Sequence, residues 1–222
     1  MVGNPGWRRL GGRLLALFAG LWLFGFSIAL LVRSGLGLDS WDVFHQGLAE
    51  RTGLGLGTIV IAVGAVVLAL WIPLRQRPGV GTVSNVIVVG LAVDQSLSIL
   101  HAPDELGLQI AFMLGGILTN AVATSLYIGA GLGPGPRDGL MTGLVSRGLS
   151  LRFVRTSIEL AVLIAGWLLG GTVGIGTVLY ALSIGPLVHY LLPRMTIGGE
   201  RRRKRRTYGA CGEIHEPGLA NE

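Results

Sequence analysis

Gly-Leu-Gly-Leu-Asp-Ser-Trp-Asp at residues 35–42 is followed 96 residues later by Gly-Leu-Gly-Pro-Gly-Pro-Arg-Asp at residues 131–138. Over the seventeen aligned positions that begin at these points, seven residues are identical. After a slip of one residue the match resumes, with Gly-Val-Gly-Thr-Val at 79–83 opposite Gly-Ile-Gly-Thr-Val at 174–178. The chain therefore carries one sequence pattern twice.

The composition is that of a membrane protein. Half of the residues are hydrophobic, the mean hydropathy is +0.63 and 14% of the residues are charged. A soluble domain usually has about 25% charged residues. Residues 14–32 and 106–136 contain no charge at all, and a helix needs about 20 apolar residues to cross the hydrocarbon core.

Each copy of the pattern contains three apolar stretches, and an odd number of spans places the second copy upside down in the membrane, as in many secondary transporters. We expect an all-α, polytopic membrane helix bundle of six transmembrane helices, built as two inverted three-helix repeats. The six predicted spans are 10–33, 55–74, 80–100, 107–129, 153–170 and 176–192. A short extra helix is expected after the first span of each repeat, within 39–52 and 135–149. The membrane domain is predicted at 1–198, with repeats at about 10–100 and about 107–193, and a disordered basic tail at 199–222.

The basic residues predict the orientation. If both termini are cytoplasmic, sixteen of the eighteen Lys and Arg residues lie on the inside, and only Arg33 and Arg51 lie outside. The positive-inside rule favours this arrangement. The expected arrangement is therefore multi-pass, with both termini cytoplasmic.

The starts of the two short helices are the first candidate site. Asp39 is predicted to cap the first helix, which puts Asp42 at its third position, and Gly135 to cap the second, with Pro136 first and Asp138 third. The helix-start glycines are Gly35, Gly37, Gly131, Gly133 and Gly135, and Trp41 accompanies the first aspartate. Two interpretations stay open. The aspartates stabilise the helix dipole, or the two helix starts approach each other and bind an anionic group, a cation or a proton.

Asp94 and His189 occupy equivalent positions in the third and sixth spans and are the second candidate site. Ionisable groups at membrane depth normally face a polar cavity or a partner, but both residues also lie near enough to span ends for an interfacial position. Glu159 is expected to pair with Arg155 one helical turn earlier.

The leading functional hypothesis is a small permease whose solute or ion path runs between the repeats, bordered by Asp42, Asp138, Trp41, Asp94 and His189. The alternative is a membrane scaffold or regulatory protein that does not transport. No catalytic set, metal cluster or cofactor motif is visible, so we expect no enzyme. The run Arg201–Arg206 predicts contact with anionic lipid rather than nucleic acid. Assembly of several copies is left open.

The pattern Arg33-x-Gly-Leu-Gly-x-x-x-Trp-Asp-Val, together with the second Gly-Leu-Gly-Pro-Gly element and the Gly-x-Gly-Thr of 79–82, resembles the YitT/YczE-like family of bacterial membrane proteins. The resemblance covers roughly residues 10–195. It implies a compact integral membrane protein of the bacterial inner membrane, without an agreed substrate.

Overall fold

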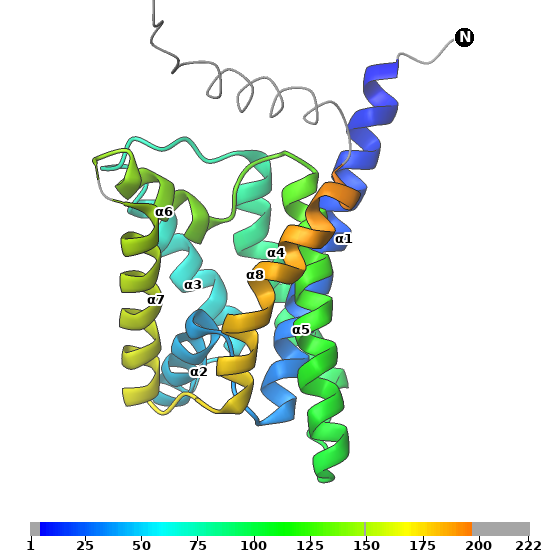
Figure 1. The fold of residues 1–222 in the computed structure, drawn as a ribbon, viewed down its shortest axis with the longest axis vertical. Coiled ribbons are helices and arrows are strands. Elements are labelled where there is room, and N and C mark those ends of the chain that lie inside the picture. The colour runs from blue at the N-terminus through cyan, green and yellow to red at the C-terminus, as the bar shows by residue number, and fades with distance from the viewer. Residues whose placement is uncertain (1–4, 149, 197–222) are drawn as a thin grey trace, which may run out of the picture.

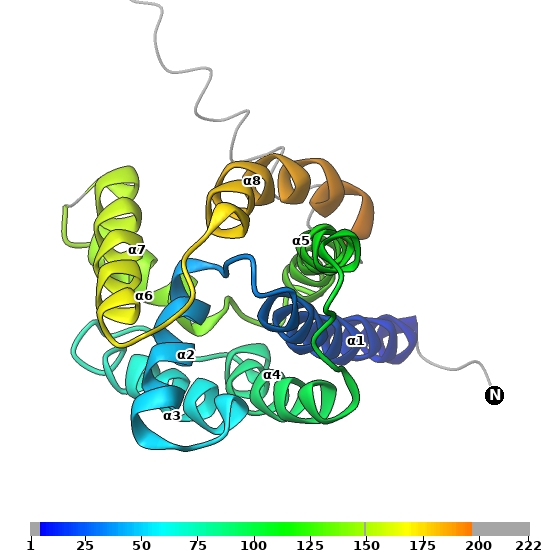
Figure 2. The ribbon, with the colours of Figure 1, turned by 90° about the horizontal axis from the view of Figure 1, so that it is seen from below.

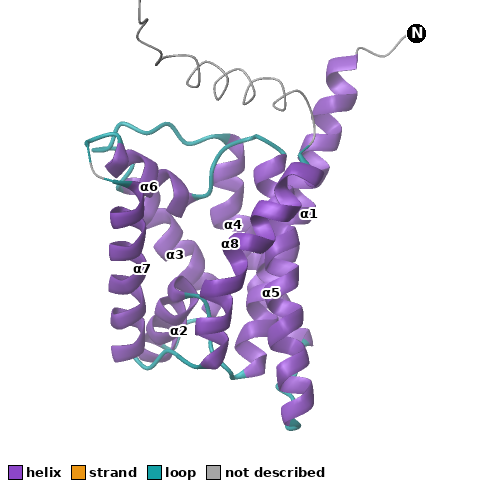
Figure 3. Cartoon of the chain, viewed as in Figure 1, coloured by secondary structure: helices purple, strands orange, loops and turns teal. Residues whose placement is uncertain are grey.

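The computed structural model describes residues 5–148 and 150–196. Throughout these ranges the regular structure is helical, without a strand, as predicted (Figure 3). The helices are α1 (Pro5–Ser34), α2 (Ser40–Thr52), α3 (Leu56–Ala69), α4 (Val80–Ile99), α5 (Leu106–Gly129), α6 (Pro136–Val145), α7 (Leu151–Leu168) and α8 (Ile175–Met195). A long helix followed by a short one opens each half of the chain (Figure 1).

Four helices are long and apolar enough to cross a membrane, namely α1, α4, α5 and α8. The α2–α3 pair is bent by 115° at its break and adds a fifth candidate if it forms one broken span. The 14 residues of α3 extend about 21 Å, less than the roughly 30 Å of a hydrocarbon core. The first half of α7 carries Arg152, Arg155 and Glu159. Length and composition therefore support four or five of the six predicted spans.

The helix boundaries agree with the predicted segments, apart from the end of the second span. Its predicted limits were 55–74, but α3 ends at Ala69 and turns follow to Leu74. Pro73 disfavours helical backbone at the residue before it. The Trp71 indole Nε1 also donates a hydrogen bond to the Pro136 carbonyl at 3.0 Å, which fixes this turn against the start of α6.

Helices α1 and α5 pack along each other, with α4 against α1 and α8 against α5. Glycines allow the close approach. A Cβ at Gly20 would lie 2.8 Å from the Tyr127 nitrogen of α5, and one at Gly25 would lie 2.8 Å from the Val89 carbonyl of α4. Small residues at such crossings are the usual packing device of membrane helices.

The two halves also exchange backbone hydrogen bonds at equivalent positions. The Gly176 N–H donates to the Leu36 carbonyl at 2.8 Å, and the Gly81 N–H donates to the Leu132 carbonyl at 3.0 Å. The loop before each short helix thus contacts the start of the last helix of the other half.

The predicted helix-start glycines make these loop contacts possible. Gly37 and Gly133 have φ values of 121° and 138°, which residues with a side chain rarely adopt. An added Cβ would lie 2.7 Å from the Thr177 hydroxyl oxygen and 2.8 Å from the Thr82 hydroxyl oxygen, respectively. Gly35 and Gly131 also have positive φ, of 66° and 64°.

The two short helices lie at different heights in the molecule. In Figure 1, α6 is near the end where α1 begins, and α2 is near the opposite end. Seen along the bundle in Figure 2, both project inside the outline drawn by the long helices. The first residues of both short helices are therefore directed into the interior of the bundle.

Candidate functional site

The starts of α2 and α6 meet through an ion pair. Arg137, the second residue of α6, donates from Nη1 to Asp39 Oδ2 at 2.7 Å, and their side chains are 29% and 16% exposed. The guanidinium carbon also lies 5.7 Å from the ring centroids of Phe24 and Trp41, within the range of a cation–π contact. Arg137 thus joins α1, α2 and α6 at one point.

Asp39 is the residue before α2, as predicted, but its side chain makes no capping hydrogen bond. Its carboxylate instead accepts the hydrogen bond from Arg137. Gly135 and Pro136 stand at the cap and first position of α6, as predicted.

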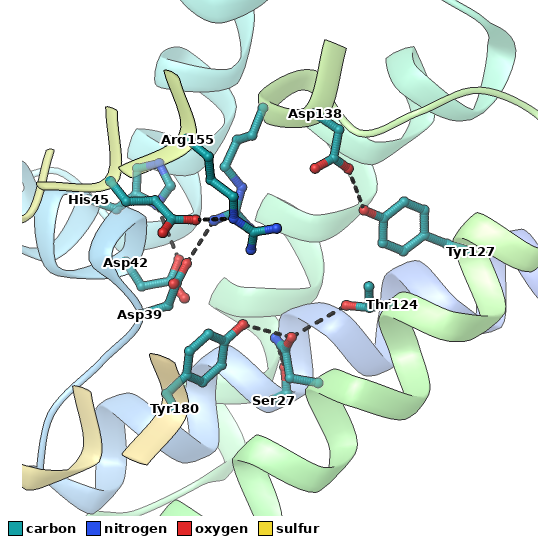
Figure 4. A network of polar contacts seen from close by, with 12 residues as sticks. Ser27, Asp39, Asp42, His45, Thr124, Tyr127, Asp138, Arg155 and Tyr180 are labelled. Carbon is teal, nitrogen blue, oxygen red and sulfur yellow. Dashed lines mark hydrogen bonds and ion pairs between the residues drawn. The ribbon is translucent and has the colours of Figure 1, made fainter. Parts of the chain in front are cut away.

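Asp42 is buried next to His45. Asp42 is 2% exposed and His45 is 7% exposed, and Asp42 Oδ1 lies 3.3 Å from His45 Nδ1 (Figure 4). Asp42 lies in the first turn of α2, where a carboxylate also interacts favourably with the helix dipole. The pair is one turn apart, so α2 alone holds its geometry.

Asp138 has a different environment from Asp42. Its Oδ2 accepts a hydrogen bond from the Tyr127 hydroxyl of α5 at 3.3 Å (Figure 4). The two aspartates therefore occupy equivalent sequence positions but have different partners. Asp42 contacts the imidazole of His45, and Asp138 accepts a hydrogen bond from the phenol of Tyr127.

A cavity of about 40 Å³ lies beside the Arg137 junction, between α1, α2, α3, α4 and the start of α6. Its polar lining residues are Trp41, Asp42, His45, Asn85 and Arg137. Its other lining residues are Phe24, Ile28, Val60, Val63, Gly64, Val67, Val86, Val89 and Pro136. The cavity therefore has a charged end and an aliphatic wall, and Trp41 and Asp42 are the predicted site residues that line it.

Asp94 does not line this cavity and instead contacts the start of α3. Asp94 Oδ1 accepts the Gly57 N–H at 2.7 Å, and Gly57 is the second residue of α3. The exposed Asp94 side chain thereby satisfies one of the unpaired N–H groups at the start of that helix. His189 is exposed on α8 and does not line the cavity. The structure does not bring Asp94 and His189 together with Asp42.

A buried chain of hydrogen bonds joins α1, α5 and α8 near the junction (Figure 4). Asn120 Nδ2 donates to the Ser27 hydroxyl at 2.9 Å, and the Tyr180 hydroxyl donates to Asn120 Oδ1 at 2.9 Å. The expected Arg155–Glu159 pair is also present, with 2.9 Å between Nε and Oε1. The hydrogen bonds of Asn120 therefore link α1, α5 and α8 inside the bundle, whereas the Arg155–Glu159 pair lies within α7.

Sequence reasoning missed Arg137 and His45 as site residues and placed Arg137 with the cytoplasmic charges. In the structure, Arg137 also reaches the Asp39 carboxylate and lines the cavity. One signal was available. Arg137 replaces Trp41 at the aligned position of the second copy, and a cation in an otherwise apolar repeat needs a partner.

The fold and this interior polar junction define a helical membrane protein, which sits in a lipid bilayer. Residues 11–193 match DUF6198, a family of unknown function, and the chain belongs to that family. It is 43% identical over 179 residues to an uncharacterized protein of Haemophilus influenzae, covering 80% of this chain and 82% of that protein. It is 35% identical over 181 residues to the uncharacterized membrane protein YczE of Bacillus subtilis, covering 80% and 84% of the two chains. The expected kinship with YczE-like proteins is confirmed, and no solved structure matches the chain.

Proposed function

We propose that this protein is a small permease of the bacterial inner membrane, with two inverted halves and both termini in the cytoplasm. One observation carries the proposal: the starts of α2 and α6 converge on a cavity that has a charged end, in the interior of a membrane protein. Charged groups are expensive at such a depth, and they are usually retained where they serve a path for an ion or solute.

The paired contacts between the halves support the inverted arrangement. Beyond the two exchanged backbone hydrogen bonds, Arg51 Nε donates to the Leu169 carbonyl at 3.3 Å, and Arg147 Nη2 donates to the Pro73 carbonyl at 2.6 Å. Each donor and each acceptor is 96 residues from its counterpart. Two halves related by a twofold axis in the membrane plane would produce such reciprocal contacts.

The positions of the short helices also support inversion, because α2 and α6 lie towards opposite ends of the bundle in Figure 1. An inverted pair of repeats can alternate between outward and inward openings while the binding site stays near the middle. We propose that the protein has no enzymatic activity. The proposed lipid contact at Arg201–Arg206 lies outside the described residues.

The test is solute flux with the purified protein in liposomes, using a panel of small anions, cations and zwitterions. The permease predicts uptake of at least one class above protein-free liposomes, and loss of that uptake in Asp42→Asn. Wild-type liposomes that pass none of the solutes, while the protein keeps its helical spectrum, argue for the scaffold instead. Deletion of residues 200–222 distinguishes the two further, since a permease retains its flux without the tail.

A further inference from the structure

We propose that the cavity binds a small zwitterion of the α-amino-acid type, with its carboxylate at Arg137 and its ammonium group at Asp42. The proposal rests on the permease function and names its class of solute. Both opposite charges belong to residues that line one small space, so a solute that carries both charges matches the site better than a simple anion or cation.

The cationic side of the site has free hydrogen-bond donors. A guanidinium has five N–H groups in a planar fork, and within the described residues Arg137 uses Nη1 on Asp39 for its hydrogen bond. Its remaining N–H groups are available to a second carboxylate, the anion that this fork suits best. Trp41 adds another donor. Its side chain is buried at 6% exposure, and its Nε1 has no hydrogen-bond partner among the described residues.

The anionic side of the site is Asp42. Its Oδ1 lies near His45 Nδ1, and its Oδ2 accepts no hydrogen bond within the described part of the chain. An ionised carboxylate offers about four acceptor positions, and an ammonium group has three donors to give. Since an incompletely paired carboxylate is unfavourable at membrane depth, an ammonium group from the solute would stabilise it.

The rest of the lining limits the side chain of the solute. Five valines form an aliphatic wall that offers no hydrogen bonds to a polar side chain. They are Val60, Val63, Val67, Val86 and Val89. A water molecule requires about 10–15 Å³ of such space, so the cavity of about 40 Å³ accommodates roughly three water molecules. This is the size class of alanine, with its single methyl group. A charged side chain would meet this aliphatic wall without a hydrogen-bond partner.

The two sequence copies contribute different groups to the cavity. The residues 96 positions after Phe24, Ile28 and Trp41 are Asn120, Thr124 and Arg137. The first copy supplies the aliphatic wall together with Asp42, His45 and Asn85, whereas the second copy supplies the guanidinium of Arg137. Divergence of the two halves thus produced an asymmetric site.

The test measures competition for radiolabelled L-alanine bound to the full-length protein in lipid nanodiscs. Propionate lacks the ammonium group, and ethylamine lacks the carboxylate. The zwitterion site predicts that each competes at least about tenfold more weakly than unlabelled alanine, because each loses one charged contact, worth about 1.4 kcal/mol or more. Equal competition by propionate or by ethylamine overturns the proposal, as does the absence of alanine binding.

Two variants locate the contacts. Asp42→Asn is expected to weaken alanine to the level of propionate while propionate binding persists, and Trp41→Phe is expected to weaken alanine and propionate by the same factor. Asp104→Asn and Trp167→Phe are the matched controls, because Asp104 and the Trp167 side chain are exposed and outside the cavity. Should Asp42→Asn fail to fold, the ligand series on the unaltered protein decides the question.

Failure of this inference and failure of the permease proposal give different results. Liposomes that take up another solute class while alanine does not bind overturn the zwitterion and leave the permease in place. Alanine binding without flux of any solute supports the site and contradicts transport.

Discussion

Arg137 and Asp39 form a 2.7 Å ion pair between helices that begin 96 residues apart in equivalent positions of the two sequence copies. The pair ties the start of α6 to the start of α2. The side chains of Arg137 and Asp39 are largely shielded from solvent, with exposed fractions of 29% and 16%, respectively. The pair is therefore the junction on which both the site and the packing of the two halves depend.

Removal of one partner is expected to destabilise the protein. Breaking a fully buried pair costs about 3–5 kcal/mol, and the partial exposure of this pair reduces the expected loss for Arg137→Gln to about 1–3 kcal/mol. The double variant Asp39→Asn with Arg137→Gln leaves no unpaired charge and should recover part of that loss. Thermal unfolding in detergent measures both, and a single variant as stable as the wild type contradicts the junction's structural role.

The loop glycines should tolerate no side chain. Gly37→Ala and Gly133→Ala combine positive φ with close contacts to Thr177 and Thr82, so we expect a loss of about 1–3 kcal/mol for each. Gly115→Ala is the control. It lies within α5, and an added Cβ would meet no atom within 4 Å. Its unfolding temperature should equal or exceed that of the wild type, and a similar fall in all three variants would rule out this explanation.

The two aspartates should respond differently to neutralisation. Asp42→Asn removes a charge from the cavity lining, so uptake should fall at least about tenfold. Asp138→Asn keeps an oxygen that can accept the hydrogen bond from the Tyr127 hydroxyl, and uptake should change less than threefold, or about 0.6 kcal/mol. Liposome flux at equal protein density compares them. Equal loss in both would mean that Asp138 also belongs to the path.

The orientation predicts opposite results for two reporter fusions. An enzyme that is active only outside the cytoplasm should be active after Pro103, in the segment between α4 and α5, and silent after Thr207. Immunoblots of both fusions control for expression. The reverse pattern would invert the proposed topology and move α2 to the cytoplasmic side.

Much of the fold could be predicted because the signals are local. Uncharged stretches predicted α1 and α5, and glycine together with proline marked the start of α6 at Pro136. The early end of α3 was not predicted from hydropathy. Pro73 was a local signal for it, but the contact that fixes the turn, from Trp71 to the Pro136 carbonyl 65 residues away, is not visible in the sequence.

The site was less accessible to sequence reasoning, because its pairings are distant in the chain. Asp42 and Trp41 were recognised from the repeated motif, and both line the cavity. The partner of Asp39 is 98 residues away, and counting charges by loop does not reveal which carboxylate Arg137 contacts. Asp94 was expected to face a polar cavity or a partner. Its partner is the Gly57 N–H at the start of α3, a contact that exists only once α3 and α4 pack together.

The measurement that tests the permease most directly is the accessibility of the cavity from the two sides of the membrane. Asn85→Cys places a thiol in the cavity lining, in a background where Cys211→Ser removes the native cysteine. A membrane-impermeant maleimide would be applied to right-side-out and to inverted vesicles. The control is Val66→Cys, because the Val66 side chain is exposed on the surface of α3 and does not line the cavity. Alternating access predicts labelling of the Asn85→Cys protein from both sides, and slower labelling when the transported solute is present. A cavity thiol that reacts from neither side, while remaining reactive in detergent, would contradict the account.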